Sequence, residues 1–202
     1  MKIIELVLDE MAFLNGIDAI SIVEHPAIEE NFVALNKDQK QEFATQNQEK
    51  RLLLGPALIP NKTIYRKQMG EEFYVYFSQS TIRRASELFL MRGNQNKSTL
   101  EHAAQLNGLS VVESWIVEDP AKDKSAIYGM SMPVGTWMVS MKVNNDEIWE
   151  NFIKTGAVKG FSIEGFFADK VNLAKVESES MTHEDALEFL YEVSKMLSNA
   201  NS

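Results

Sequence analysis

The chain contains no cysteine and only three histidines among its 202 residues. The lack of cysteine excludes disulfide bonds, zinc sites built on thiolates and cysteine nucleophiles. Basic residues are scarce too: 20 against 29 acidic residues give a net charge of −9, which disfavours binding to nucleic acid or anionic membranes. No stretch approaches the roughly 18 apolar residues of a membrane span, and the first ten residues are too acidic for a secretory signal. We therefore expect a soluble cytoplasmic protein.

Apolar residues make up 45% of the chain, which is enough for a folded core. The composition changes along the sequence, and we predict five regions from it. They are an N-terminal strand-containing segment (1–35), a polar linker (36–51), a main domain with dense apolar patterning (52–168), a second linker (169–181) and a C-terminal amphipathic helix (182–198). The narrow apolar seam of that last helix either packs on the domain or binds a partner helix.

The main domain has the pattern of an α+β fold built on a mostly antiparallel sheet, closed as a barrel or stacked as a sandwich. Apolar and β-branched runs predict strands at 52–60, 72–78, 109–118, 135–143 and 158–167. Two helices interrupt them. One is capped by Ser80, buries Ile82, Ala85 and Phe89, and pairs Arg83 with Glu87. The other begins at 144 or 145 and ends at 156.

The three histidines are the bases available to a serine nucleophile. His183 lies at the start of the final helix and is typical of a solvated surface residue. His25 precedes a proline, which favours an extended or turning segment with no chemical role. His102 lies in a polar stretch between the first helix and the strand at 109–118. The residues alone leave open whether His102 is a base or a loop residue without a role in chemistry.

Ser162 lies in the strand-like run VKGFSIEGFF. Strand alternation puts it on one face with Gly160 and Glu164, and the phenylalanine at 161 on the other. The glycines at 160 and 165 indicate a close backbone approach, and an extended substrate would meet little obstruction there. The motif is not the G-x-S-x-G elbow, because the second glycine comes one residue late. A barrel-strand serine beside bulge glycines is the alternative.

Other clusters give weaker signals. The acidic residues between 113 and 123 do not have the spacing of an EF-hand loop. The sequence therefore predicts no metal site and no cofactor.

Several blocks of the chain resemble the XkdF-like family of phage serine proteases, which are relatives of prohead maturation proteases. The resemblance covers about 52–170, in LGPALIPNKTIYR, YVYFS, VVESWIVEDP, GTWM and GFSIEG, and the N-terminal GIDAISIVEHPAIEENFVAL is similar to the leader of phage members. It implies a fold like that of the herpesvirus assemblins, a mostly antiparallel β-barrel wrapped by helices. It also implies that Ser162 is the nucleophile and His102 the base.

The third catalytic residue is less well defined by the resemblance. In many relatives an acidic segment similar to E-V-S-V-V-x-x-P-A follows the serine strand. Here a similar string stands at the N-terminus and begins at Asp18. We expect that strand to dock beside the serine strand, with Asp18 orienting His102. The alternatives are Glu113, on the strand after His102, and then Glu164, two residues from the serine.

The function implied is that of a serine endopeptidase of prohead maturation. Its substrates would be scaffold protein, N-terminal segments of the capsid protein and the protease itself. Its partners would be the scaffold and major capsid proteins, in the host cytoplasm inside the prohead. A homo-oligomer, such as a dimer, is expected, and no nucleic acid or membrane. The alternative is a catalytically inactive, scaffold-associated assembly protein.

Overall fold

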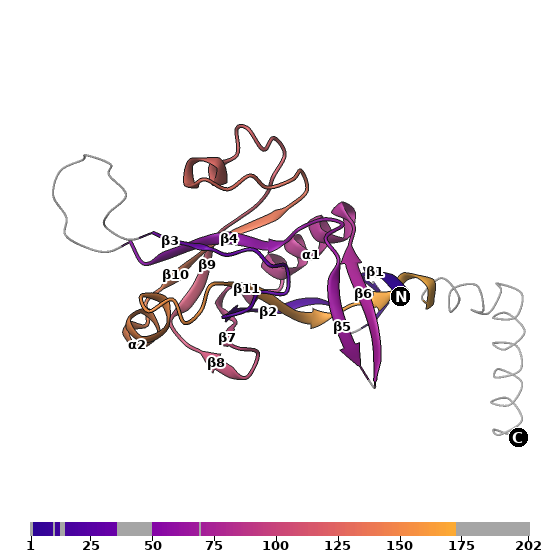
Figure 1. Ribbon diagram of the computed structural model, residues 1–202, viewed down its shortest axis with the longest axis horizontal. Coiled ribbons are helices and arrows are strands. Elements are labelled where there is room, and N and C mark those ends of the chain that lie inside the picture. The colour runs from indigo at the N-terminus through magenta and orange to yellow at the C-terminus, as the bar shows by residue number, and fades with distance from the viewer. Residues whose placement is uncertain (1, 10, 13–14, 36–49, 69, 173–202) are drawn as a thin grey trace, which may run out of the picture. The chain divides into compact units, whose positions relative to one another are not determined.

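The computed structural model describes residues 2–9, 11–12, 15–35, 50–68 and 70–172 (Figure 1). The chain divides into two compact units, Met1–Asp169 and Lys170–Ser202. Most of the polar linker 36–51, most of the linker 169–181, the C-terminal helix and His183 lie outside the described residues.

Twelve strands of the described chain form three sheets of four strands each. The first sheet has the order β12 (Ala168–Asp169), β1 (Lys2–Val7), β6 (Glu71–Phe77) and β5 (Ile64–Gln68). The second has the order β3 (Val33–Leu35), β4 (Leu52–Leu58), β10 (Trp137–Val143) and β9 (Leu109–Ile116). The third has the order β11 (Gly160–Phe166), β2 (Gly16–Val23), β7 (Ser98–Leu100) and β8 (Ala104–Leu106).

This architecture agrees with the α+β expectation, since sheets dominate and helices are few. Each of the five predicted strands corresponds to one in the structure, namely β4, β6, β9, β10 and β11. Most pairings are antiparallel, while β1–β6 and β2–β7 are parallel. Among the described residues none of the three sheets closes on itself, so the assemblin-like barrel stays a prediction.

Helix α1 (Gln79–Met91) buries the predicted face: Ile82, Ala85 and Phe89 are all 0% exposed. Phe89 meets Trp137 of β10 edge to face, with ring centroids 5.5 Å apart. The helix begins earlier than expected, because Ser78 is the N-cap rather than Ser80. The Ser78 hydroxyl bonds the hydroxyls of Ser80 and Thr81 and caps no backbone N–H.

The predicted ion pair between Arg83 and Glu87 of α1 is wrong, because each residue has a different partner. Arg83 pairs with Glu118, at 3.3 Å, and Glu87 pairs with Arg84, at 3.6 Å. The connection that carries Glu118 passes close to α1, which gives Arg83 a tertiary partner in place of the local one.

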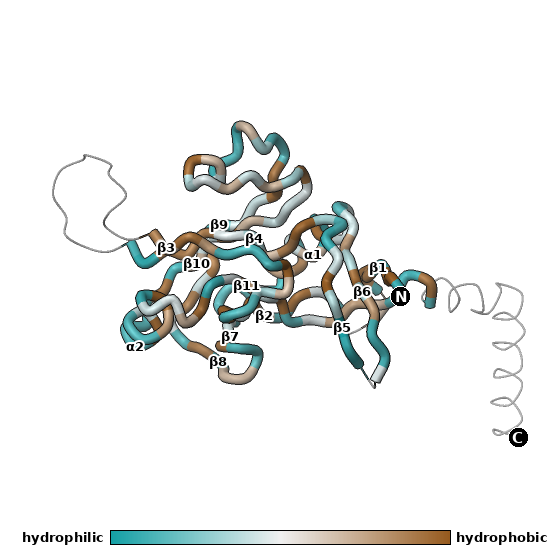
Figure 2. The backbone as a smooth tube through the Cα atoms, viewed as in Figure 1, coloured by the Kyte–Doolittle hydropathy of each residue, from teal (hydrophilic) through white to brown (hydrophobic). Residues whose placement is uncertain are grey.

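Short helical turns connect the remaining strands. They are η1 (Asn94–Asn96), η2 (Lys124–Tyr128), α2 (Asp146–Ile148) and the π-helical turn η3 (Trp149–Ile153). Asn145 caps α2 by accepting a hydrogen bond from the Ile148 N–H at 3.0 Å, so 145 rather than 144 is the cap. Gly156, at a φ of +72°, follows the end of η3 as predicted. Figure 2 shows hydrophilic residues where β5 ends and β6 begins.

The packing of α1 gives the first prediction. Phe89→Ala should lower the free energy of unfolding by about 3–5 kcal/mol, because it removes a fully buried ring and leaves a cavity against Trp137. Urea denaturation followed by circular dichroism measures the change. The adjacent Leu90 is 43% exposed, so Leu90→Ala is the matched control and should cost less than about 1 kcal/mol. Equal losses in the two variants would contradict the packing described.

Candidate active site

Ser162 lies near the middle of β11, on the predicted face of that strand. Phe161 points the other way, is 1% exposed and packs on Phe32 with ring centroids 5.2 Å apart. Ser162 itself is 7% exposed, and its hydroxyl has no hydrogen-bond partner among the described residues. Ser162 therefore lies on the face of the sheet opposite Phe161.

The glycines of β11 serve a different purpose from the one expected. A Cβ at Gly160 would lie 2.6 Å from Pro26, and one at Gly165 would lie 2.1 Å from the carbonyl oxygen of Gly16. The close approach is therefore made by the protein's own chain and not by a substrate. Pro26 covers the start of the strand, so the expected unobstructed path over Gly160 is absent.

Strand β2 pairs antiparallel with β11, as predicted for the N-terminal string. The register places Ser162 directly opposite Ser21, and residues opposite each other share one face with Cβ atoms about 4.5–5.5 Å apart. Ser21 is 0% exposed and was not singled out from the sequence. The sequence predicted the strand, but it did not predict the register that places Ser21 opposite Ser162.

His102 lies in the tight turn between β7 and β8. Glu101 and His102 have φ angles of +51° and +57°, and the Ala103 N–H donates to the Leu100 carbonyl at 3.0 Å. A β-turn whose two central residues both have positive φ angles normally takes Asn-Gly at those positions. A side chain other than glycine costs roughly 1 kcal/mol or more in this region. Such strain is typical of functional sites.

Tertiary hydrogen bonds hold this turn against the third sheet. The Glu101 N–H donates to the Ile22 carbonyl at 3.1 Å, and the Glu24 N–H donates to the Glu101 carboxylate at 2.6 Å. The His102 N–H donates to the Ser21 hydroxyl at 3.1 Å. The Ser21 hydroxyl is in turn 3.2 Å from the Thr99 carbonyl, to which it donates.

Glu164 is the carboxylate that meets the histidine. Its Oε1 lies 3.1 Å from His102 Nδ1 and also accepts a hydrogen bond from the Thr99 hydroxyl. A carboxylate at Nδ1 keeps the proton on that nitrogen and leaves Nε2 as the basic one. Nε2 makes no hydrogen bond to any residue that the structure describes. Glu164 thus joins the histidine turn to the strand that carries Ser162.

The two carboxylates preferred from the sequence lie elsewhere. Asp18 is half-buried on β2, at the shift in the β2–β11 register, where Ala19 lies opposite Glu164 and Ile17 opposite Gly165. Its carboxylate makes no hydrogen bond or ion pair within the described chain. Glu113 lies on β9, in a different sheet, and accepts hydrogen bonds from Lys124 and Ser140. Neither one is joined to His102.

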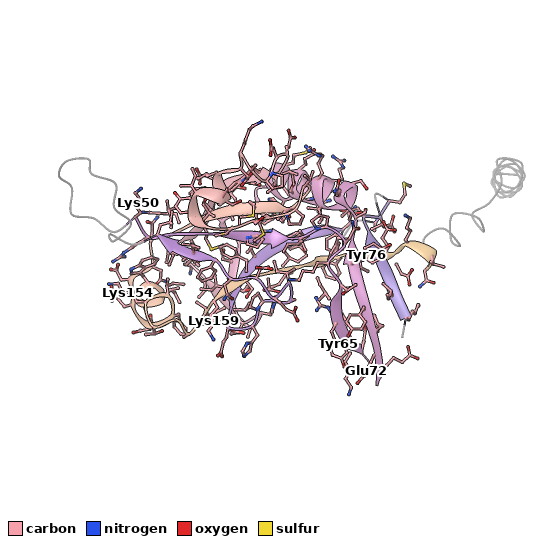
Figure 3. All side chains as sticks on the ribbon, turned by 45° about the horizontal axis from the view of Figure 1, so that its top comes forward. Lys50, Tyr65, Glu72, Tyr76, Lys154 and Lys159 are labelled. Atoms are coloured by element: carbon pink, nitrogen blue, oxygen red, sulfur yellow. The ribbon has the colours of Figure 1, made fainter. Side chains whose placement is uncertain are left out.

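His25 is the other histidine with a described position. Its Nε2 lies 3.8 Å from the carboxylate of Glu24. His25 lines a groove next to the start of β11, together with Lys159, which is labelled in Figure 3.

Within the described ranges no group of three His, Asp or Glu side chains could hold a metal ion. In the same residues no helix is long and apolar enough to cross a membrane.

The turn conformation gives the second prediction. Both His102→Gly and His102→Ala remove the imidazole, but only glycine adopts a φ of +57° without strain. The glycine variant should therefore be more stable than the alanine variant by about 1 kcal/mol in urea denaturation. At Leu90, inside α1, the order should reverse, with glycine about 1 kcal/mol worse than alanine. The same order at both positions would contradict the left-handed conformation of His102.

A third prediction concerns Glu113. Hydrogen bonds from Lys124, and then from Ser140, hold the pKa of its carboxyl below the ordinary value. Because the folded pKa is the lower one, the ionised carboxyl stabilises the fold above the unfolded pKa of about 4.3. That stability disappears as the pH falls through the folded pKa.

Glu113→Gln should therefore lower the unfolding free energy at pH 7, and the difference from wild type should narrow progressively below about pH 4.3. Urea titrations of both proteins at several pH values measure this. A difference that stays constant between pH 7 and pH 3 would show that the charge of Glu113 has no part in it.

Comparison with known proteins gives one finding. The family model described as "Putative phage serine protease XkdF" matches residues 40–172, which is more than half of the chain. No curated protein and no solved structure matches the chain. The matched range contains His102, Glu113, Ser162 and Glu164, whereas Asp18 and Ser21 lie before it.

Proposed function

The chain belongs to the XkdF family of phage serine proteases, and from this we propose that it is a serine endopeptidase in which Ser162 attacks the peptide bond. The observation that carries the proposal is the 3.1 Å contact between His102 Nδ1 and Glu164. It supports a catalytic role because a carboxylate on Nδ1 is what a histidine base needs beside a serine. Glu164 takes the place of Asp18 and Glu113 in this proposal.

The proposed chemistry is acyl transfer. Ser162 Oγ attacks the substrate carbonyl carbon while Nε2 of His102 takes the hydroxyl proton. The proton then passes from His102 to the leaving amine, and water hydrolyses the acyl-enzyme by the same steps. Glu164 remains ionised and stabilises the imidazolium. Thr99 and Ser21 position Glu164 and the backbone of His102.

The biological role that we propose is prohead maturation. The substrates would be scaffold protein, capsid-protein segments and the enzyme itself, inside the prohead in the host cytoplasm. The scaffold and major capsid proteins would be the partners, and a homo-oligomer the active form. An assemblin-like barrel belongs to the same proposal.

A second candidate is an assembly protein without catalysis. Two observations favour it: Ser162 is only 7% exposed, and its hydroxyl makes no hydrogen bond to His102 or any other described residue. Hydrogen bonds of catalytic groups are often long or absent before substrate binds, so we prefer the protease.

The fourth prediction separates these candidates. The chain is co-expressed with its scaffold and major capsid proteins, and every protein is weighed by intact mass spectrometry. Wild type should give defined truncations that are absent with Ser162→Ala. Glu164→Gln should slow their appearance by about 10²–10⁴-fold, because the histidine loses the charge that holds its tautomer.

Asp18→Asn and Glu113→Gln are the matched controls, since each neutralises one of the other two carboxylates. Both should keep the rate within a few-fold of wild type. A large loss in either control, with Glu164→Gln active, would move the third role to that residue. Full-length proteins in every sample, with the chain retained in proheads, would favour the assembly protein.

A further inference from the structure

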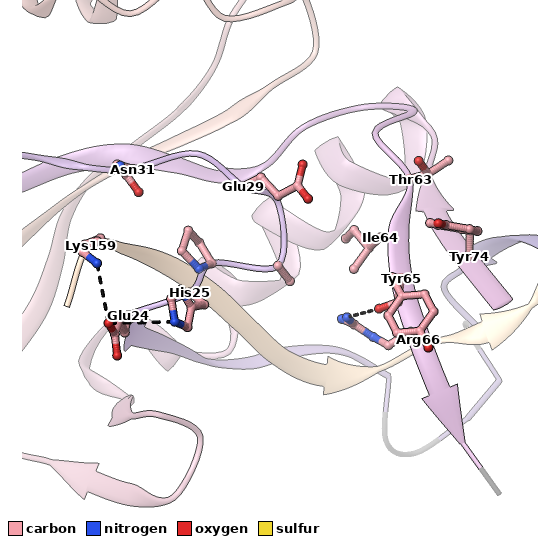
Figure 4. A pocket seen from close by; sticks show the side chains of 12 residues that line it. Glu24, His25, Glu29, Asn31, Thr63, Ile64, Tyr65, Arg66, Tyr74 and Lys159 are labelled. Carbon is pink, nitrogen blue, oxygen red and sulfur yellow. Dashed lines mark hydrogen bonds and ion pairs between the residues drawn. The ribbon is translucent and has the colours of Figure 1, made fainter. Parts of the chain in front are cut away.

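A groove of about 580 Å³ lies between β5 and the segment that follows β2. Figure 4 shows Glu24, His25 and Lys159 on one side of it, with Tyr65 and Arg66 on the other. Its volume is within the range of ligand-binding pockets, roughly 300–1,000 Å³. Pro26 belongs to its lining and also covers Gly160. Pro26 therefore stands between the groove and the start of β11.

One wall of the groove is an open sheet edge. Strand β5 stands last in its sheet and pairs only with β6 in the described chain. The Tyr65 carbonyl accepts a hydrogen bond from the guanidinium of Arg66 at 3.1 Å, so it points away from β6. Because outward and inward backbone groups alternate along a strand, Lys67 presents its N–H and carbonyl on the same open side. An extended peptide can pair with such an edge.

Two charged side chains of the groove, Glu29 and Arg66, make no ion pair with any described residue. Lys159 and His25 both face Glu24, at 3.6 and 3.8 Å. Arg66 has no acidic partner among the described residues, and its guanidinium bonds only the Tyr65 carbonyl there. A cation is thus left available on the β5 wall, next to the open backbone edge.

We propose that this groove binds an extended polypeptide segment that pairs with the edge of β5 and sets an acidic side chain against Arg66. The inference rests on the proposed function in its choice of occupant, since a polypeptide is what an endopeptidase binds. Arg66 is the specificity-determining residue of this arrangement, and the backbone of β5 supplies the sequence-independent part of the binding.

The test uses two capped octapeptides of alternating valine and threonine that differ at one central position, glutamate in one and lysine in the other. Each is titrated into the ¹⁵N-labelled full chain carrying Ser162→Ala, so that binding is measured without cleavage. Amide shifts should concentrate at 64–68 and 24–27. The glutamate peptide should bind about fivefold more tightly, the upper range for an exposed ion pair.

Two further variants divide the binding into its parts. Arg66→Glu should reverse the preference in favour of the lysine peptide, while Lys122→Glu, at a side chain 85% exposed outside the groove, should leave it unchanged. Lys67→Pro removes an outward N–H and should weaken both peptides equally, whereas Lys67→Ala should not. Shifts that avoid β5, or equal affinities that Arg66→Glu does not change, would overturn the proposal.

Cleavage of the same peptides by the wild-type chain is followed separately by mass spectrometry. Binding at β5 without cleavage, in every condition including added capsid proteins, would overturn the proposed function and leave the groove assignment intact. Cleavage of the peptides with no amide shifts at β5 would support the proposed function and overturn the groove assignment. Shifts at 64–68 on concentrating the peptide-free protein would assign the edge to a second copy of the chain and refute a peptide site.

Discussion

The antiparallel pairing of β2 with β11 is the constraint on which the candidate site depends. Its register sets Ser162 opposite Ser21 and leaves Glu164 on the same face. A slip of one residue would turn Ser162 into the core and bring Phe161 to the site. The burial of Phe161 against Phe32 opposes that slip, so the packing of an apolar ring determines which face carries the chemistry.

The parallel pairing of β2 with β7 brings in the third component. It carries the chain to the turn at Glu101 and His102, whose two positive φ angles are unfavourable by themselves. Hydrogen bonds to Ser21 and Ile22 stabilise the turn in place. Strand β2 therefore supports both the serine strand and the histidine turn, although it lies outside the matched family range. That dependence makes the N-terminal segment part of the site.

Much of the architecture could be predicted from local patterns. Five strands and the buried face of α1 follow from alternation and helical spacing, and the docking of the N-terminal string beside the serine strand was also predicted. The short strands β7 and β8 were not, because three residues carry too little periodicity. The choice among Asp18, Glu113 and Glu164 depended on contacts between distant segments: His102 and Glu164 are 62 residues apart in the chain.

The sequence by itself determined which chemistries were open: without cysteine, the candidate nucleophiles were serine, threonine, lysine and the carboxylates, and only three histidines were there to act as a base. It also determined that Ser162 and Glu164 share a strand face, since alternation is a local property of the backbone. Only the tertiary structure decided which carboxylate reaches His102, that Ser21 supports it, and that β5 stands at the edge of its sheet. Those facts depend on register and on sheet order, and both are set by the packing of residues far apart in the chain.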